Sequence, residues 1–255
     1  MIYEIQEMTN IIPLFEGMTD TTLTSCLQNI MGKVYADSLK NPRSAMAILG
    51  DFCFLAGEPN AELVSYKPSH LTQDFIIMMP QNESWCALIE KCYGSKSKRV
   101  TRYAFHKDGD VFDRTALQNI VDGLSSEYTL ALIDEKLYHK CREIPWCQDW
   151  VKNFPSYELY SRHGLGVTIL KDGEPIAGAS SYSGYIGGIE IEIVTKEEYR
   201  RQGLASVCGA KLILECLKRE LYPSWDAQNK WSAALATKLG YHFDCEYPAY
   251  EIHGY

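Results

Sequence analysis

Two arginines and a glycine stand where an expected strand (residues 189–195) gives way to an expected amphipathic helix (204–221). The first turn of a helix has unpaired backbone N–H groups and the positive end of the helix dipole, and both favour an anion. Gly203 lets the backbone approach a ligand closely, and Arg200 and Arg201 add charge-assisted donors. The spacing therefore predicts a site for the diphosphate of a phosphorylated cofactor.

Two carboxylates, Glu190 and Glu192, lie on the strand that precedes this segment. A partly desolvated carboxylate can accept a proton from an ammonium group, and acyl transfer to an amine requires an uncharged nucleophile. We therefore predict that Glu190 or Glu192 acts as a catalytic base. Binding of a cationic substrate, packing and a surface ion pair are the alternatives for the same side chains.

Two blocks of sequence resemble a known family. Arg200-x-x-Gly203-x-Ala205 resembles the Gln/Arg-x-x-Gly-x-Gly/Ala acetyl-CoA loop of the GNAT superfamily of N-acetyltransferases. The block 229–241 resembles the later helix of that family, which begins with Asn and ends in Lys-Leu-Gly-aromatic. The resemblance covers approximately residues 126–255, and its details are most similar to a bacterial subgroup that includes the zwittermicin A self-resistance acetyltransferase.

The resemblance implies a fold, a cosubstrate and a set of contacts. The fold is α/β (α+β), with a mixed, mostly antiparallel sheet flanked by helices. Acetyl-CoA is the implied cosubstrate, with its pantetheine arm against the strand and against Asn229 and Ser232, although Asn229 is equally suited to capping a helix. The residues implied to contact the arm from the strand are Ile193, Val194 and Thr195, and those implied to hold the diphosphate are Arg200, Arg201, Gln202, Gly203, Leu204 and Ala205.

The sequence departs from the family pattern at the general acid. Many members have a Tyr where this chain has Ala236, so another group or water must protonate the leaving thiolate. The tyrosines that are candidates for this role, with packing as the alternative for each, are Tyr182, Tyr241, Tyr247 and Tyr250. Tyr182 and Asp226 are also candidates for the acceptor pocket, with helix capping as the alternative for Asp226.

The register of the strand 189–195 decides whether its glutamates or its isoleucines face the site. Counted back from Arg200, isoleucines occupy the positions where several relatives have a catalytic Glu. A bulge or an extra turn residue would shift the alternation by one and bring Glu190 and Glu192 to the site.

Bulk properties narrow the functional class. The chain has 255 residues and a net charge of -8, a balance that disfavours nucleic acid and favours a cationic small molecule. It has no apolar stretch of about 18 residues and no leader-like N-terminus, so we expect no membrane association. Nine scattered cysteines without a Cys-x-x-Cys pair predict a reduced cytoplasmic protein without a metal. The oligomeric state is left open.

The expected organisation is two domains, 1–125 and 126–255. In the second we expect a helix at 146–160, strands at 166–170 and 175–182 joined by the turn Asp172-Gly173, a short strand at 224–226, a helix at 229–239, and strands near 241–246 and 249–253 that complete its sheet. In the first we expect a helix that is capped within 19–21 and runs to about 31, strands at 45–55, 75–79 and 99–105, and a helix at 83–93. The order in the first domain faintly resembles the second, so we hypothesise a degenerate duplicate or a cap over the substrate, and one cofactor site.

The resulting prediction is an acetyl-CoA-dependent N-acetyltransferase that acts by direct transfer on a primary amine of a small cationic molecule, for which an amino-bearing antibiotic is one candidate. The alternative is a non-catalytic sensor or structural protein that binds acyl-CoA. Modification of a protein N-terminus is a third interpretation, and it would require a groove open at both ends.

Overall fold

The computed structural model describes residues 1–255, which form two compact units. The first comprises Met1–Arg102 together with Glu246–Tyr255, and the second comprises Tyr103–Cys245. The boundary expected near residue 125 therefore lies inside the second unit. The end of the chain belongs to the first unit rather than to the second.

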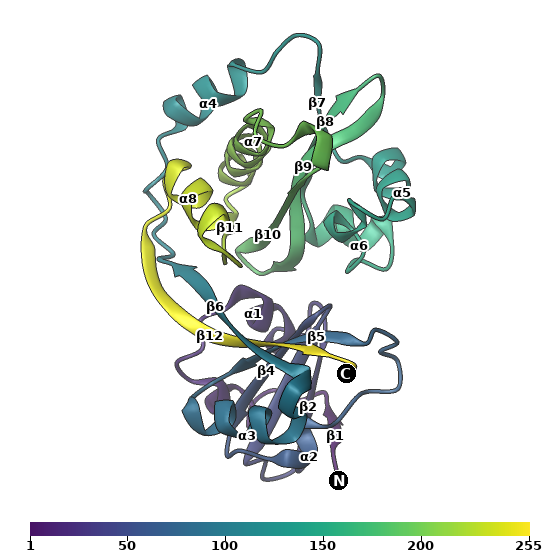
Figure 1. Cartoon of the computed structure of the whole chain (residues 1–255), viewed down its shortest axis with the longest axis vertical. Helices are drawn as coiled ribbons and strands as arrows, with labels where there is room; N and C mark the ends of the chain where they lie inside the picture. The colour runs from purple at the N-terminus through teal and green to yellow at the C-terminus, as the bar shows by residue number, and fades with distance from the viewer. The chain divides into compact units, whose positions relative to one another are not determined.

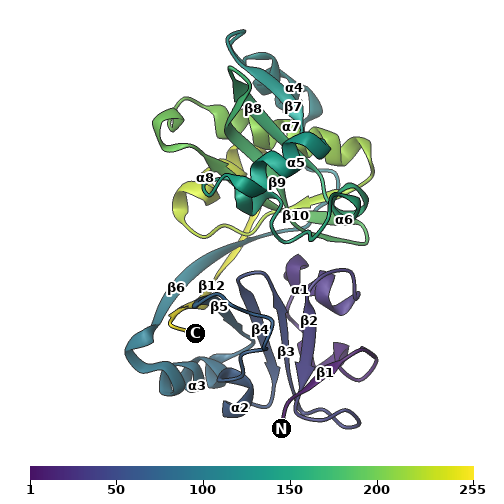
Figure 2. The ribbon, with the colours of Figure 1, turned by 90° about the vertical axis from the view of Figure 1, so that its right-hand side faces the viewer.

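The first unit is built on a seven-stranded sheet in the order β1-β2-β3-β4-β5-β12-β6, in which β6 and β12 lie side by side (Figure 2). Its strands are β1 (Tyr3–Ile5), β2 (Lys33–Ala36), β3 (Ser44–Leu49), β4 (Phe52–Gly57), β5 (Phe75–Pro80), β6 (Ser97–Phe105) and β12 (Phe243–His253). Its helices are η1 (Ile12–Phe15), α1 (Thr21–Leu27), α2 (Ala61–Val64), α3 (Glu83–Tyr93) and η2 (Gly94–Lys96). Apolar side chains of α2 and α3 form a buried cluster with the strands, centred on Trp85, Met46 and Ile76.

Local patterns in this unit predicted α3 correctly but merged two strands into one. The expected strand 45–55 is the antiparallel pair β3 and β4, because the chain reverses at Gly50, whose φ is 57°. The first helix ends at Leu27 instead of about Met31. Gly50-Asp51 divides the run 45–55, and a Gly-Asp pair between two apolar segments is typical of a two-residue hairpin turn, so the signal for two strands was present in the sequence and was overlooked.

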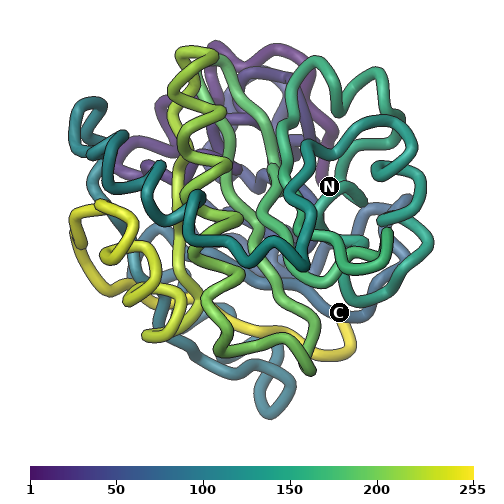
Figure 3. Tube along the Cα trace, turned by 90° about the horizontal axis from the view of Figure 1, so that it is seen from above, coloured from purple at the N-terminus to yellow at the C-terminus, as the bar shows by residue number.

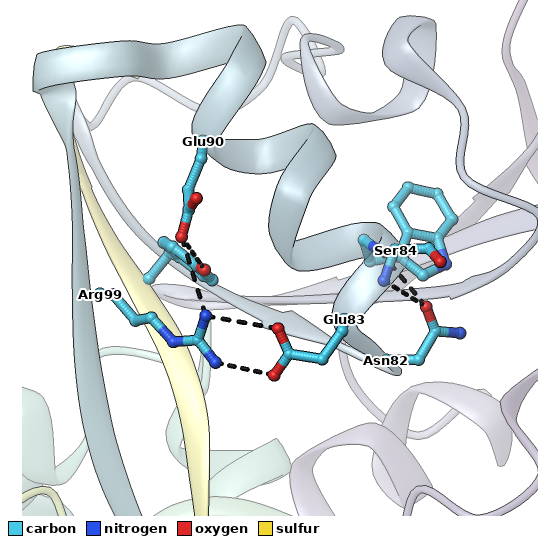
Figure 4. Close-up of polar contacts among 7 residues, drawn as sticks. Asn82, Glu83, Ser84, Glu90 and Arg99 are labelled. Carbon is cyan, nitrogen blue, oxygen red and sulfur yellow. Dashed lines mark hydrogen bonds and ion pairs between the residues drawn. The ribbon is translucent and has the colours of Figure 1, made fainter.

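The last strand of the chain is the main departure from expectation. Residues 241–253 contain the single strand β12, which pairs with β5 of the first sheet instead of completing the second. Tyr250 of β12 donates a hydrogen bond to Glu90 of α3 at 2.5 Å, and Arg99 of β6 binds Glu83 and approaches Glu90 (Figure 4). The pattern of a strand does not state which sheet it joins, so the local sequence could not reveal this pairing.

The second unit is built on a five-stranded sheet in the order β11-β10-β9-β8-β7. Its strands are β7 (Thr129–Leu132), β8 (Gly166–Lys171), β9 (Glu174–Tyr185), β10 (Gly188–Thr195) and β11 (Tyr222–Ser224). Its helices are α4 (Arg114–Asp122), α5 (Glu135–Glu143), η3 (Gln148–Trp150), α6 (Tyr157–His163), η4 (Glu197–Tyr199), α7 (Leu204–Lys218) and α8 (Lys230–Lys238).

Helices cover both faces of this second sheet. Helix α7 packs against β8, β9, β10 and β11 and carries α4 on its outer side, whereas η3 and α6 pack against β9 from the opposite face (Figures 1 and 3). Ile189 and Ile191 of β10 belong to the apolar cluster beneath α7. The prediction of a mixed, mostly antiparallel sheet flanked by helices is confirmed.

Several local predictions in the second unit hold, and two do not. Asp172 and Gly173 both have positive φ, 52° and 80°, as the predicted two-residue turn requires. Residues 146–160 do not form one helix: the segment before Pro155 contains only the 3-10 helix η3 and turns, and α6 begins after Pro155, with Ser156 as its cap. The short strand β11 includes Pro223 and ends at Ser224, since an edge strand tolerates a proline.

The two units share one order of elements. In each, four antiparallel strands are followed by a helix, a fifth strand parallel to the fourth, and a further helix, α3 in the first unit and α8 in the second. The hypothesis of a duplicated half required a similar sheet in both halves, and the structure contains it.

Candidate active site

The N-terminus of α7 differs from every other α-helix of the chain. Seven helices begin at a residue whose side chain accepts hydrogen bonds from the first turn, whereas α7 begins at Gly203, which has no side chain to do so. The seven capping residues are Asp20, Asn60, Asn82, Asp113, Asp134, Ser156 and Asn229. Its first-turn amides are thus left for a ligand or solvent, at the positive end of a 15-residue helix.

The loop before α7 turns sharply and keeps its surface open. Arg201 and Gly203 both have positive φ, 61° and 81°, and no atom lies within 4 Å of the place where a Cβ on Gly203 would stand. Arg200 donates from Nε to the carbonyl oxygen of Thr195 at 3.2 Å, which fixes the loop against the end of β10. Gln202 accepts a hydrogen bond from Tyr128 at 3.3 Å.

Three cations surround this helix terminus without a carboxylate partner. Arg200 and Arg201 are exposed on the loop, and Lys238 reaches from the end of α8 to Ser206 Oγ in the first turn of α7, at 3.4 Å. The nearby Glu198 is bound to Lys196 at 2.6 Å, and that hydrogen bond lowers the pKa of Glu198. Cations at the positive end of a helix dipole repel it, so the arrangement favours an anionic ligand.

Strands β10 and β11 separate beside this terminus. They pair in parallel only from Gly188 to Glu190 of β10, and Ile191–Thr195 run on without a partner in β11. The Oγ1 atom of Thr195 is buried and has no hydrogen-bond partner. An open strand edge and an unpaired hydroxyl fit an extended polar ligand such as a pantetheine arm, which can add to the sheet as a strand does.

The two candidate bases differ in their surroundings. Glu190 is 6% exposed, and its Oε1 accepts the backbone N–H of Asp226 at 2.8 Å. Glu192 is partly exposed and stands opposite Ser180 of β9. Both project from the face of β10 opposite to the isoleucines that pack beneath α7.

A bulge occurs in this strand pair, on β9. Ser183 faces Glu190 and Ser181 faces Ile191, so Tyr182 between them has no opposite residue. Asn153 donates to the Tyr182 carbonyl oxygen at 3.1 Å and satisfies it. Since the extra residue is on β9, the alternation along β10 is intact, and the isoleucines point away from the glutamates along its whole length.

The start of α8 lies close to the end of β11. Asn229 caps the helix by accepting from Ser232 N at 2.9 Å, and Ser232 Oγ accepts from Trp225 Nε1 at 3.1 Å. The capping role considered for Asn229 is therefore confirmed, whereas Asp226 does not cap this helix. Contact of Asn229 and Ser232 with a pantetheine arm remains a prediction.

Two of the proposed replacement acids are engaged elsewhere. Tyr241 is 1% exposed and donates to the Pro223 carbonyl oxygen at 2.6 Å, and burial raises its pKa well above the usual range. Tyr250 belongs to the first unit and donates to Glu90. Each hydroxyl thus donates its proton to a fixed acceptor, which makes it poorly suited to protonate a leaving group. Ala236 itself is fully buried in the core beneath α7.

The predicted site residues fall into two groups, one at each end of β10. The end of β10, the loop 200–205 and the start of α7 are contiguous, and β11 connects Glu190 to α8 through Trp225 and Asp226. Lys238 and Ser206 were missed. Lys238 is the lysine of the Lys-Leu-Gly-aromatic pattern, so its place in the motif was the one available signal.

The whole chain, not only its second half, matches a known family. The family model for GNAT acetyltransferase matches residues 12–250. The chain belongs to this family. The match extends well into the first unit, although the motifs were confined to residues after 126. Membership supports an acyltransferase activity in general.

Individual relatives agree with this assignment. An uncharacterized N-acetyltransferase, YdfB of Bacillus subtilis (strain 168), is 25% identical over 232 residues, covering 88% of this chain and 86% of that protein. The crystal structure of a GCN5-related N-acetyltransferase-like protein from Streptococcus suis 89/1591 superposes with a TM-score of 0.91 at 43% identity, covering 96% and 98% of the two chains. A tandem GNAT protein from the clavulanic acid biosynthesis pathway has the same fold, with a TM-score of 0.53 at 12% identity over 88% of this chain and 83% of its own.

Three further observations concern the wider predictions. No helix of the chain is long and apolar enough to span a membrane. No cluster of three or more metal-ligating side chains is present. All nine cysteines are free thiols, and seven of them are buried.

Proposed function

We propose that this protein is an acetyl-CoA-dependent N-acetyltransferase that transfers the acetyl group directly to a primary amine of a small cationic molecule. The observation that carries the proposal is the uncapped N-terminus of α7, where Gly203 leaves space and three unpaired cations gather. An amino-bearing antibiotic, and the zwittermicin A-type subgroup, are the finer assignments we infer from the sequence. Nine free cysteines fit a reducing compartment, and we place the protein in the cytoplasm.

The residues of the second unit fit the cosubstrate. Arg200 and Arg201 would bind the diphosphate together with the first-turn amides of α7, and the open edge from Ile193 to Thr195 would orient the pantetheine arm. The unpaired Thr195 hydroxyl would gain a partner there. When bound, acetyl-CoA supplies the thioester that donates the acetyl group and a thiolate that leaves as coenzyme A.

The acidic side chains suit a cationic acceptor. Glu192 is partly exposed on the unpaired stretch of β10 and is placed to take a proton from an ammonium, directly or through water. Tyr182, in the bulge across from Glu190, and Asp226, beyond the end of β11, are the proposed contacts to the acceptor. The net charge of -8 favours approach of a cation over approach of an acidic substrate.

Calorimetric titration with acetyl-CoA tests the cofactor site. Gly203→Glu places a carboxylate where the phosphates would bind, and we expect the dissociation constant to rise at least about 100-fold. Gly173→Glu is a matched control, because Gly173 also has a φ of 80° and open space around its Cβ position, in the β8–β9 turn. Both variants should lose about 1–2 kcal/mol of stability through backbone strain. Equal acetyl-CoA affinity in the two variants would refute the assigned loop.

One observation favours a second candidate, a non-catalytic sensor that binds acyl-CoA. The family Tyr is replaced by the buried Ala236, and Tyr241 and Tyr250 are bound elsewhere. A sensor would bind acetyl-CoA with the same dependence on Gly203. It would release no thiol with a panel of primary amines, whereas the enzyme would.

A further inference from the structure

We propose that Glu190 is a positioning residue that ends the pairing of β10 with β11 and so keeps open the gap that receives the pantetheine arm. Glu192 is then the carboxylate left for the acceptor amine. This inference rests on the proposed function. The sequence named Glu190 or Glu192 as the catalytic base, and we now assign the two residues different roles.

The pairing stops at Glu190. The registered pairs of β10 and β11 are Gly188 with Tyr222, Ile189 with Pro223, and Glu190 with Ser224. In this parallel pattern Tyr222 N–H donates to the Gly187 carbonyl oxygen at 2.8 Å, one residue before its opposite partner. If the ladder continued, Asp226 would face Glu192, and its N–H would donate to the carbonyl oxygen of Ile191.

The Glu190 carboxylate takes the place of that acceptor. Asp226 N–H donates to Glu190 Oε1 at 2.8 Å instead of to the backbone of β10. A buried N–H must have a partner, so a side-chain acceptor lets the backbone after β11 turn away at no loss of hydrogen bonding. The backbone of Ile191–Thr195 is thereby left facing the gap.

The charge of Glu190 contributes to the raised pKa of three tyrosines, Tyr185, Tyr222 and Tyr241. Burial, with added effects of the Asp108 and Glu190 charges, raises the pKa of Tyr222 to about 12. Burial, followed by the same Glu190 charge, also raises the pKa of Tyr185. The hydroxyls of Tyr222 and Tyr241 donate to the His106 and Pro223 carbonyl oxygens, not to Glu190.

This environment suits a fixed acceptor and not a base. A carboxylate that is 6% exposed and bound to a main-chain N–H has little access to an ammonium arriving from solvent. Glu192, two residues further along the same face, lies on the part of β10 where no strand covers the edge. The geometry thus separates the two glutamates by role.

The test compares Glu190→Gln, Glu190→Met and Glu192→Gln in the full chain. Calorimetry would measure binding of acetyl-CoA and of adenosine 3′-phosphate 5′-diphosphate, which has the phosphates but no pantetheine arm. Gln keeps a carbonyl acceptor for Asp226 N–H, so Glu190→Gln should stay within about threefold of wild type in acetyl-CoA affinity and in kcat. Met removes the acceptor, so Glu190→Met should weaken acetyl-CoA at least about tenfold and leave the truncated ligand unchanged.

For Glu192→Gln we expect both ligands to bind as they do to wild type, and kcat to fall at least about 100-fold. The inference is overturned if Glu190→Gln abolishes turnover with affinity intact, since Glu190 would then be the base. It is also overturned if Glu190→Met binds acetyl-CoA as wild type does, or weakens both ligands equally through general destabilisation. If Glu190→Met does not fold, turnover by Glu190→Gln still decides between the roles. Failure of wild type to bind either ligand would instead reject the proposed function.

Discussion

The crossover from β4 to β5 in the first unit and the crossover from β10 to β11 in the second have the same topology but different chemistry. After β4 the chain reads Gly57-Glu58-Pro59-Asn60, and Asn60 caps the four-residue helix α2. After β10 it carries two unpaired arginines and an uncapped glycine before the 15-residue α7. Only the second can offer amides and positive charge to an anion.

The two units also differ in whether their fourth and fifth strands separate after the paired segment. Strands β4 and β5 stay paired from Phe52 to Leu55, and Gln81 N–H then donates to Leu55 at 3.0 Å. The Gln81 side chain accepts from Gly57 N–H, and Trp85 Nε1 donates to the Gly57 carbonyl oxygen, both at 3.0 Å. Hydrogen bonds therefore fill the space between the fourth and fifth strands in the first unit, whereas the corresponding edge of β10 in the second unit has no partner in β11. The comparison teaches that two crossovers of the same topology can differ in a few residues after the fourth strand, and that these residues make only the second suited to an anionic ligand.

The largest expected effect comes from making the second crossover acidic like the first. Arg200→Glu combined with Arg201→Glu should weaken acetyl-CoA at least about 100-fold, because two charge-assisted donors become repulsive. Titration calorimetry would measure it. The control is Lys218→Glu with Arg219→Glu, a double reversal at the exposed C-terminal end of the same helix, which should change the affinity less than about threefold. Equal losses would mean that overall charge, and not the loop, governs binding.

An intermediate effect is expected from opening the first crossover. Gln81→Leu removes the acceptor of Gly57 N–H and the donor to Leu14 and Glu16, and it should cost about 2–3 kcal/mol of unfolding free energy. Urea denaturation would measure the cost, and acetyl-CoA affinity should not change. Gln118→Leu, on the exposed face of α4, is the matched control and should cost less than about 0.5 kcal/mol. A change in acetyl-CoA affinity for Gln81→Leu would contradict a cofactor site confined to the second unit.

The smallest effect concerns α7, the helix that follows the loop 200–205. A hydrogen bond from Lys211, at 2.8 Å, lowers the pKa of Glu215 below its usual 4.5. The pair therefore stabilises the folded chain above pH 4.5, and this contribution is lost as the pH falls through the lowered pKa. Lys211→Met should cost about 0.5 kcal/mol in urea denaturation at pH 7 and nothing once Glu215 is protonated. Lys136→Met, which removes a lysine without an ion pair from α5, should show no such pH dependence.

Local sequence predicted those elements whose signals are local. Helices α3 and α7, strand β10 and the Asp172-Gly173 turn are each specified by their own periodicity, caps or turn residues. The failure at β12 depends on long-range pairing, whereas the Gly50-Asp51 turn and the start of α6 after Pro155 were local signals that the interpretation of longer elements overlooked.

The residues of the candidate site also fall into those that a local motif predicts and those that only long-range contacts identify. The loop 200–205 could be read from a contiguous motif, and the structure brings it to the open end of β10. The difference between Glu190 and Glu192 could not be read, because it depends on Asp226, whose N–H approaches Glu190 only after the chain has passed through α7. Lys238 needed the same long-range information to be placed beside Ser206.

The position of β12 between β5 and β6 has a consequence for synthesis on the ribosome. Residues 1–102 emerge first, but their sheet lacks its sixth member until residues 246–253 have been translated and have left the exit tunnel. During that interval the nascent chain presents unpaired N–H and C=O groups along β5, the kind of bare strand edge that chaperones shield and that aggregates recruit. The portion made later, Tyr103–Cys245, contains all five strands of its own sheet and can finish folding before the portion made first.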